Sequence, residues 1–303
     1  MLKKMQCYYE LGFRSIPVEF VKQKYCNDDS KFIIIDGLKV HYKDQGDGPV
    51  LVLLHGVVSF LQTWDGWYEE LKGRYRIIRL DLPGWGITGP WEKTDNINYN
   101  GDRIARFLEK FLDTLGIERC YLAGNSLGGF YAWYYAAHYP ARVEKLVLLD
   151  PIAYNQSLPF EFGLMKIPGV KFLVTHIVLP RFFIQNSINR LYGKRDRIAA
   201  KICDLYWGMI MCAGNRNTLV QVFSMIAKLS KSKTIFCDVK KIKKPVLMAW
   251  GKQDVWSRWK ETIREWQRDL PHAELIMYDN CGHMPMEEIP VETARDAHAF
   301  FMK

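Results

Sequence analysis

A Gly-x-Ser-x-Gly pattern at residues 124–128 has Ser126 at its centre. The pattern follows the short apolar run 119–123 and precedes the apolar, helix-like run 129–138. A serine in this strand–turn–helix context lies on a tight turn, where its hydroxyl stands at the carboxyl edge of a sheet and small neighbours relieve the backbone clash. The N-terminus of the following helix points at the same place. This arrangement suits attack on a carbonyl, so we predict that Ser126 is a nucleophile.

A serine hydroxyl becomes a useful nucleophile only when a base removes its proton and an acid orients that base. Asp254 lies just after the apolar run 245–250, and His283 lies just after the run 273–278. Both residues therefore fall on loops at the same sheet edge as Ser126, in the chain order serine, acid, histidine. We predict that His283 is the general base and that Asp254 orients it.

Two other residues compete for these roles. Asp150 also follows a predicted strand, but Asp254 is closer in the chain to His283 and its loop is followed by a helix. We therefore favour Asp254 as the acid. Cys281 lies two residues before His283, which invites a cysteine–histidine pair. Side chains at that spacing usually point apart, so we favour Ser126 over Cys281 as the nucleophile.

Acyl transfer also needs hydrogen-bond donors for the oxyanion that forms on the attacked carbonyl. His55 and Val57 closely follow the predicted strand 49–54. We predict that the backbone amides of Val57 and Leu127 form the oxyanion hole, and that His55 has a structural role. The segment 81–86, at the end of the next strand, is interpreted as a turn that shapes the floor of the site.

The nucleophile, the base and the acid need a sheet that brings them to one edge. Residues 32–36 and 39–44 read as a hairpin that turns at residues 37–38. Buried, β-branched runs separated by helical stretches follow, which indicates a parallel sheet covered on both faces. These runs are residues 49–54, 75–80, 119–123, 145–149, 245–250 and 273–278. Residues 100–115 carry apolar side chains at helical spacing, and Gly116 ends that predicted helix.

The character of the chain changes after Asp150. Residues 151–242 contain no clear strand and hold proline-punctuated, helix-like segments rich in Phe, Met, Trp and Ile. The strand pattern then resumes, so we predict a core of residues 1–150 and 243–303 that is interrupted by a helical cap. Within the first part of the core, residues 1–30 have weak periodicity and are expected to form an arm packed on the body.

Together these motifs resemble the α/β-hydrolase superfamily from about Phe32 to Phe301. The resemblance rests on His55-Gly56, Asp81-Leu82-Pro83-Gly84-Trp85-Gly86, Gly124-Asn125-Ser126-Leu127-Gly128-Gly129, Gly251-Lys252-Gln253-Asp254 and Gly282-His283. It implies an α/β fold with an eight-stranded, mostly parallel sheet and a helical cap inserted between strands six and seven. The chain is most similar to bacterial serine carboxylesterases of the Asn-Ser-Leu-Gly-Gly type. The resemblance implies a small-molecule ester substrate and no metal or organic cofactor.

Relatives within the superfamily leave alternatives open. The meta-cleavage-product hydrolases, which cleave a carbon–carbon bond, share the Asn-Ser-x-Gly-Gly elbow. They usually carry a longer glycine-rich oxyanion loop and a Trp after the catalytic histidine, where this chain has Val57-Val58-Ser59 and Met284. Perhydrolases related to haloperoxidases share the triad, whereas haloalkane dehalogenases and epoxide hydrolases use an aspartate in place of Ser126. A non-catalytic ligand-binding protein of the same fold is a second alternative.

The composition is that of a soluble globular protein, with 49% hydrophobic and 25% charged residues. No apolar run approaches the ~20 residues that span a bilayer. Residues 1–10 lack the apolar region of a secretory signal. The seven cysteines are scattered with no Cys-x-x-Cys pair, which fits reduced thiols and no zinc site. We therefore expect cytoplasmic residence.

The net charge of +9 is unevenly distributed along the chain. Residues 151–244 hold sixteen Lys and Arg against four Asp and Glu, which gives that segment +12 and the rest −3. The segment has no nucleic-acid motif, so we expect no nucleic-acid partner. Its apolar run 172–180 lies between Lys171 and Arg181, and such a run can lie in a lipid interface. The simpler interpretation is a buried cap helix among solvated lysines. The alternative is weak association with an anionic membrane surface.

The cap is also expected to set substrate choice. Its aromatic and methionine side chains are candidates to line an apolar acyl pocket over Ser126, although most of them can instead form the core of the cap itself. The candidates are Phe160, Phe162, Met165, Phe172, Tyr206, Trp207, Met209 and Met211.

Overall fold

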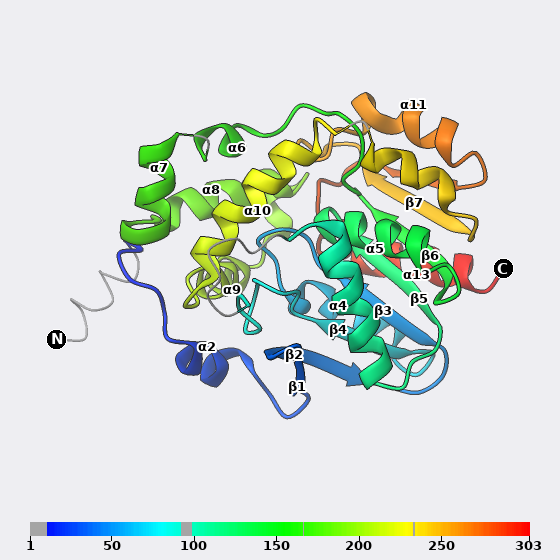
Figure 1. Cartoon of the computed structure of the whole chain (residues 1–303), viewed down its shortest axis with the longest axis horizontal. Helices are drawn as coiled ribbons and strands as arrows, with labels where there is room; N and C mark the ends of the chain where they lie inside the picture. Colours follow the sequence, from blue (N-terminus) through cyan, green and yellow to red (C-terminus); the bar gives the residue numbers. More distant parts are fainter. Residues whose placement is uncertain (1–10, 92–98, 166, 233) are drawn as a thin grey trace.

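A single sheet of eight strands organises the computed structural model (Figure 1), which describes residues 11–91, 99–165, 167–232 and 234–303. The spatial strand order is β1-β2-β4-β3-β5-β6-β7-β8. The strands are β1 (Lys31–Ile35), β2 (Leu38–Gln45), β3 (Val50–Leu54), β4 (Arg76–Leu80), β5 (Cys120–Asn125), β6 (Val143–Leu149), β7 (Val246–Gly251) and β8 (Glu274–Tyr278). From β4 to β8 every neighbouring pair is parallel, which confirms the mostly parallel sheet.

The antiparallel pairs lie at the β1 edge, where β1 pairs with β2 and β2 pairs with β4. Ile35 pairs with Leu38, so the hairpin turn consists of Asp36 and Gly37. Both turn residues have a positive φ, 47° and 79°, as a two-residue type I′ turn requires. The predicted hairpin is confirmed, but its turn lies one residue earlier than the sequence pattern placed it.

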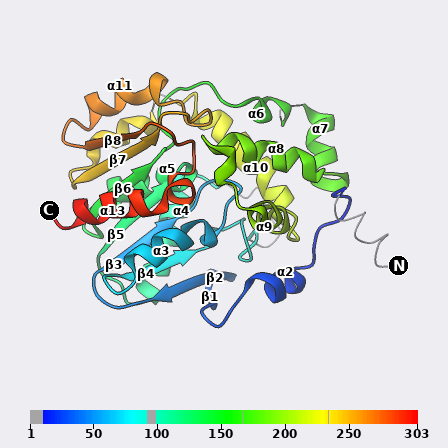
Figure 2. The same cartoon turned by 180° about the vertical axis from the view of Figure 1, so that it is seen from behind.

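Helices cover both faces of the sheet. Figure 1 shows α4 and α5 in front of the strands, and Figure 2, from behind, shows α3 and α13 on the opposite face. The helices are α3 (Asp65–Leu71), α4 (Gly101–Thr114), α5 (Leu127–His138), α11 (Trp259–Asp269) and α13 (Pro290–Phe301). The predicted helix over residues 100–115 is confirmed as α4. Asn100 caps its N-terminus, and Gly116, just after its C-terminus, has a positive φ of 66° that ends the helix.

The chain between β6 and β7 is helical, as expected for the cap. Its elements are α6 (Phe160–Leu164), α7 (Pro168–Phe172), η2 (Leu173–Ile177), α8 (Arg181–Leu191), η3 (Arg195–Arg197), α9 (Ala200–Ile210), α10 (Asn215–Leu229) and η4 (Ile235–Lys241). Figure 1 shows α6 to α10 gathered at one end of the sheet. The α/β-hydrolase fold with a cap between strands six and seven is thus confirmed, while the predicted domain bounds at residues 151 and 242 stay predictions.

The described part of the N-terminal arm packs on the cap. Ile16 forms a parallel bridge with Cys212, and its amide donates to the Met211 carbonyl at 2.7 Å. The short helix α2 (Val18–Tyr25) follows, and its Tyr25 hydroxyl donates to the Asp204 carbonyl of α9. The first ten residues of the predicted arm lie outside the described residues. No helix within the described ranges is both long and apolar enough to cross a bilayer.

Candidate active site

Ser126 lies on a strained turn between β5 and α5. Its φ of 55° and ψ of −116° are sparsely populated by residues with a side chain. Gly124 and Gly128 make this turn feasible. A Cβ atom on Gly124 would lie 2.3 Å from the Gly128 carbonyl oxygen, and one on Gly128 would lie 2.2 Å from the Leu54 carbonyl oxygen. The predicted elbow therefore requires both glycines for close backbone approach.

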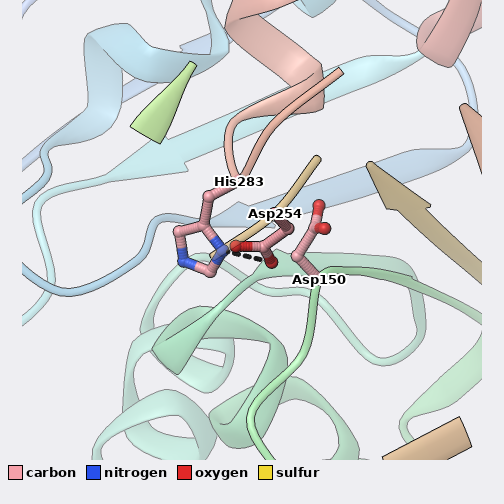
Figure 3. Close-up of side chains that lie close together, drawn as sticks. All are labelled: Asp150, Asp254 and His283. Carbon is pink, nitrogen blue, oxygen red and sulfur yellow. Dashed lines mark hydrogen bonds and ion pairs between the residues drawn. The ribbon is translucent and has the colours of Figure 1, made fainter. Parts of the chain in front are cut away.

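His283 and Asp254 form a buried pair at the same edge of the sheet. His283 Nδ1 lies 2.8 Å from Asp254 Oδ2 (Figure 3). The Asp254 carboxylate also accepts hydrogen bonds from the amides of Trp256 at 2.6 Å and Ser257 at 3.1 Å. A carboxylate held in this way favours the histidine tautomer with the proton on Nδ1. That tautomer leaves Nε2 as a proton acceptor, which is what a general base needs.

Ser126 and His283 both line one pocket beneath the cap. No hydrogen bond to the Ser126 hydroxyl occurs among the described residues. Hydrogen bonds between a nucleophile and its base are often long without substrate and tighten in the substrate complex. The structure thus places the three predicted residues at one site, and their catalytic roles stay predictions.

Asp150, the competing acid, lies directly behind Asp254. Figure 3 shows Asp254 between His283 and Asp150. Asp150 Oδ1 accepts a hydrogen bond from the Gly251 amide at 3.0 Å, and Oδ2 has no partner among the described residues. Burial, reinforced by the negative charge of Asp254, holds the pKa of Asp150 well above its usual range. A neutral Asp150 carboxyl cannot stabilise an imidazolium, which favours Asp254 as the acid.

The same three side chains are the group whose geometry could hold a metal ion, because their ligand atoms lie within 4.8 Å of one another. His283 Nδ1 and the Asp254 carboxylate already bind each other, and the carboxylate also binds two backbone amides. Asp150 has only one oxygen without a hydrogen-bond partner. These contacts fit an acid–base relay better than a metal site.

The predicted oxyanion donors flank the nucleophile. Leu127 is the first residue of α5, so its amide has no acceptor within the helix. Val57 follows Gly56, whose Cβ position lies 3.2 Å from the Ser126 Cβ atom. Neither amide donates a hydrogen bond to any other described residue. Both amides are therefore available to an oxyanion, and their role as the oxyanion hole stays a prediction.

His55 supports the loop that carries Val57. It is fully buried, its Nδ1 lies 2.8 Å from the Gly56 carbonyl oxygen, and its Nε2 accepts a hydrogen bond from the Leu82 amide at 2.9 Å. Burial lowers the pKa of His55 to about 4, against the opposing charge of Asp81. The neutral ring therefore links the ends of β3 and β4 by hydrogen bonds, which fits the structural role predicted for it.

Two further side chains position the site, and no sequence motif predicts a role for them. Asn125 Nδ2 donates to the Leu149 carbonyl at 3.2 Å and to the His283 carbonyl at 3.0 Å, which ties the elbow to the histidine loop. Trp256 stacks beside His283 with ring centroids 6.3 Å apart. The only sequence signal for Asn125 is a polar residue inside an otherwise apolar strand end.

A third such residue, Glu288, joins the histidine loop to the cap. It lies in the short helix α12 (Pro285–Glu288), and its buried carboxylate accepts hydrogen bonds from the amides of Gly282, Gly193 and Lys194 at 2.8 to 2.9 Å. The His283 amide itself donates to the Leu191 carbonyl of α8 at 2.6 Å. His283 and the cap therefore hold each other in place, a connection that no local sequence pattern predicts.

The pocket over Ser126 is apolar, and the empty space within it and at its opening to solvent is about 770 Å³. Its lining residues are Gly56, Val57, Val58, Asn125, Ser126, Glu161, Met165, Leu179, Phe183, Ile184, Ser187, Ile188, Leu191, Tyr206, Ile210, Leu219, Phe223, Trp256, His283 and Met284. Of the eight predicted cap candidates, only Met165 and Tyr206 are among them. Phe160 and Phe172 instead point to solvent, because they lie on the outer surface of the cap.

Comparison with known proteins identifies the family to which this fold belongs. A family model described as the alpha/beta hydrolase fold matches residues 49–174. A protein of Paraburkholderia phymatum, named 2-hydroxy-6-oxononadienedioate/2-hydroxy-6-oxononatrienedioate hydrolase, is 31% identical over 272 residues, which cover 84% of this chain and 89% of that protein. The chain belongs to the α/β-hydrolase family. A 2-hydroxy-6-oxo-6-phenylhexa-2,4-dienoate hydrolase of Burkholderia cepacia is 27% identical over 271 residues. That alignment covers 84% of this α/β hydrolase and 90% of the Burkholderia cepacia protein.

Solved structures of other α/β hydrolases superpose on the chain. A bacterial membrane phospholipase A, described as a virulence factor, has a TM-score of 0.72 and 25% identity, with 90% of this chain and 85% of that chain covered. The meta-cleavage product hydrolase CumD of Pseudomonas fluorescens has a TM-score of 0.74 and 22% identity, with 89% of this chain and 97% of CumD covered. The CumD likeness shows the fold alone. The protein is therefore a hydrolase of this family, and the bond that it cleaves is the remaining question.

Proposed function

We propose that this α/β hydrolase cleaves carboxylic esters with lipophilic acyl chains. The observation that carries the proposal is the lining of the pocket over Ser126. Among the described residues, that lining contains no lysine or arginine. Its one carboxylate, Glu161, forms an ion pair with Arg190 from outside the pocket lining. Such a pocket suits a neutral, apolar substrate, because an ion would lose its hydration there without gaining a counter-charge.

In this mechanism the Ser126 Oγ attacks the ester carbonyl while His283 Nε2 accepts the hydroxyl proton. Asp254 stabilises the resulting imidazolium through Nδ1, and the amides of Val57 and Leu127 bind the oxyanion. The tetrahedral intermediate collapses to an acyl-Ser126 ester, and the alcohol leaves with the proton from His283. Water, deprotonated by His283, then attacks the acyl-enzyme and releases the carboxylic acid.

A solved relative adds support for a lipid ester. The structure at 25% identity is that of a membrane phospholipase A, and a phospholipase A cleaves the ester of a long acyl chain. The lining of the pocket supports this choice, because aliphatic side chains of α8 line one side of it. These side chains are Ile184, Ile188 and Leu191.

The second candidate function is carbon–carbon bond hydrolysis. It is favoured by the named activity of the relatives at 31% identity. Those relatives are named for dioate substrates, which carry two carboxylates. Binding a dianion normally requires positively charged partners, and none lines the described pocket. The absence of positively charged side chains from the described pocket lining is therefore the reason to prefer the ester reaction.

A substrate panel tests the two candidates. We expect p-nitrophenyl esters of graded acyl length to be hydrolysed with a kcat/KM at least about 100-fold above that for a 2-hydroxy-6-oxodienedioate and for a 2-hydroxy-6-oxo-6-phenyldienoate, because neither kind of carboxylate finds a cation in the pocket. The opposite ranking would establish the carbon–carbon hydrolase. No turnover of either class, together with tight binding of an apolar ligand, would point to a non-catalytic binding protein.

The acyl pocket itself can be tested at Ser187 of α8. Ser187 lines the pocket and its hydroxyl donates to the Phe183 carbonyl at 3.1 Å. We expect Ser187→Leu to fill part of the pocket. This change should lower kcat/KM for a long-chain p-nitrophenyl ester about tenfold relative to the butyrate. The measurement is the ratio of the two kcat/KM values.

A matched control variant exists on α10. Ser224 makes the same kind of helical hydrogen bond, to the Val220 carbonyl at 2.8 Å, but does not line the pocket over Ser126. Ser224→Leu should therefore leave the chain-length ratio unchanged. An equal change of the ratio in both variants would mean that the effect comes from the packing of the cap and that the acyl chain does not contact Ser187.

A further inference from the structure

One end of the cap exposes large apolar side chains to solvent. We call this surface the cap tip and define it by the five residues Leu11, Phe172, Leu173, Ile177 and Phe182. Phe182 is 66% exposed and Phe172 is 56% exposed. Single exposed apolar residues are normal, but several on one surface mark a site of interaction with a partner or a membrane.

The cap tip is a single surface built from separate segments. The Leu179 amide donates to the Gly12 carbonyl at 3.2 Å, and Arg216 donates to the same oxygen at 3.0 Å. These bonds fasten the arm beside the turn that precedes α8. Both views show the described start of the arm meeting α7 and the beginning of α8, at the opposite end of the molecule from the C-terminus (Figures 1 and 2).

The run 172–180 does not form the buried helix of the simpler interpretation. It begins at the end of α7, continues as the π-helical turn η2 and ends in extended backbone at Val178. Val174 and Leu179 are its only buried side chains. The other large apolar side chains of the run have no core to enter, because the short turn has only one face against the cap.

The charged side chains of the two segments that form the cap tip are all basic, and one of them, Arg181, is paired with Asp204 of α9. Neither residues 11–18 nor residues 167–183 contain an Asp or a Glu. Arg14 and Lys171 are exposed beside the apolar side chains, and neither forms an ion pair within the described residues. An apolar surface with a cationic rim complements the anionic face of a membrane. It does not complement a second copy of itself, because the two sets of positive charges would repel.

The cap tip also lies next to the pocket over Ser126. Leu179, just before α8, and Ile184, in the first turn of α8, line that pocket. The side chain of Phe182, also in the first turn of α8, is instead exposed to solvent. One helix therefore contributes to both surfaces, and a bilayer against the cap tip would lie a single helix away from the acyl pocket.

We propose that the cap tip docks into the headgroup layer of an anionic lipid bilayer. Its apolar side chains insert between the headgroups, and Arg14 and Lys171 lie at the level of the lipid phosphates. Delivery of lipid esters from the bilayer to Ser126 rests on the proposed function. The docking does not depend on it, because the cap tip contributes no catalytic group.

Vesicle co-sedimentation tests the docking. The full chain carries Ser126→Ala so that no lipid is consumed, and it is mixed with vesicles of phosphatidylcholine alone or with phosphatidylglycerol added. We expect pelleting with the anionic vesicles at low salt and at least about tenfold weaker partitioning at high salt, because salt screens the basic rim. Protein that stays in the supernatant with anionic vesicles at low salt would overturn the proposal.

A pair of double variants separates the cap tip from general surface hydrophobicity. Phe172→Asp with Phe182→Asp should reduce partitioning at least about tenfold, because two carboxylates would enter the headgroup layer. Ile34→Asp with Met302→Asp is the matched control, since Ile34 is 69% exposed and Met302 is 71% exposed away from the cap tip. The control should pellet like the parent. Equal partitioning of the two double variants would overturn the proposal.

Two further measurements keep the outcomes distinct. With Ser126 restored, the cap-tip variant should hydrolyse a short water-soluble ester as the parent does, which shows that it folds. Lost vesicle binding with this activity intact leaves the proposed function standing, and binding without any ester turnover leaves the docking standing. A dimer in solution that the cap-tip variant converts to a monomer would assign the surface to a second copy and overturn the membrane proposal.

Discussion

Ser126→Ala is expected to abolish ester hydrolysis and leave the fold intact. Loss of a serine nucleophile lowers kcat by about 10⁵- to 10⁶-fold, because the remaining members of a triad cannot act without it. Alanine is smaller than serine, so the turn with a φ of 55° should tolerate it. The measurements are steady-state kinetics with a p-nitrophenyl ester and labelling by a fluorophosphonate probe, which reacts covalently with an activated serine.

The control for this variant is Ser224→Ala, on a cap helix and outside the pocket over Ser126. It should keep both turnover and labelling. A Ser126→Ala protein with a normal circular dichroism spectrum and turnover near that of the parent would show that another residue is the nucleophile. A variant that neither folds nor turns over would be replaced by Ser126→Gly, which removes the hydroxyl and suits a positive φ.

Asp254→Asn is expected to lower kcat by about 10³- to 10⁴-fold. Asparagine preserves the shape of the side chain, but it cannot stabilise an imidazolium and can present an amide hydrogen to Nδ1, which favours the wrong histidine tautomer. The side chain also accepts from the amides of Trp256 and Ser257, and an asparagine oxygen can keep one of these bonds. The readout is kcat across pH, together with the melting temperature.

Asp150→Asn is the matched comparison, because its carboxyl lies beside that of Asp254 at the same edge of the sheet. The raised pKa of Asp150 favours a neutral carboxyl, which asparagine imitates in shape and charge. Asparagine can also keep the bond from the Gly251 amide to Oδ1. We expect less than about a tenfold loss of kcat. A larger loss for Asp150→Asn than for Asp254→Asn would mean that Asp150 is the acid.

The cap shows where local sequence patterns stop being informative. Eight of its aromatic and methionine residues were candidates for the acyl pocket, yet only Met165 and Tyr206 line it. The aliphatic residues of α8, such as Ile184 and Ile188, supply much of the lining instead. Hydrophobicity predicts that a residue will be covered by something, but the tilt of each short helix decides whether that is the cap, the substrate or solvent.

The sequence by itself determined the sheet, the order of the catalytic candidates and the elbow. Buried strands have a period and composition that mark them locally, and a glycine pattern around a serine reports a backbone constraint that only a few conformations satisfy. The positions of Asp254 and His283 followed from the same logic, because both come directly after parallel strands. Parallel strands bring their carboxyl ends to one edge whatever lies between them in the chain.

Only the tertiary structure decided the relations between distant segments. Asp150 and Asp254 follow neighbouring strands. Their positions in the chain do not reveal that burial raises the pKa of Asp150, or that the Asp254 carboxylate binds His283 and two backbone amides. The tie from Asn125 to the His283 loop spans 158 residues. The pocket lining without lysine or arginine and the exposed cap tip likewise arise from packing between segments, because burial and charge environment are properties of the folded chain and not of any stretch of its sequence.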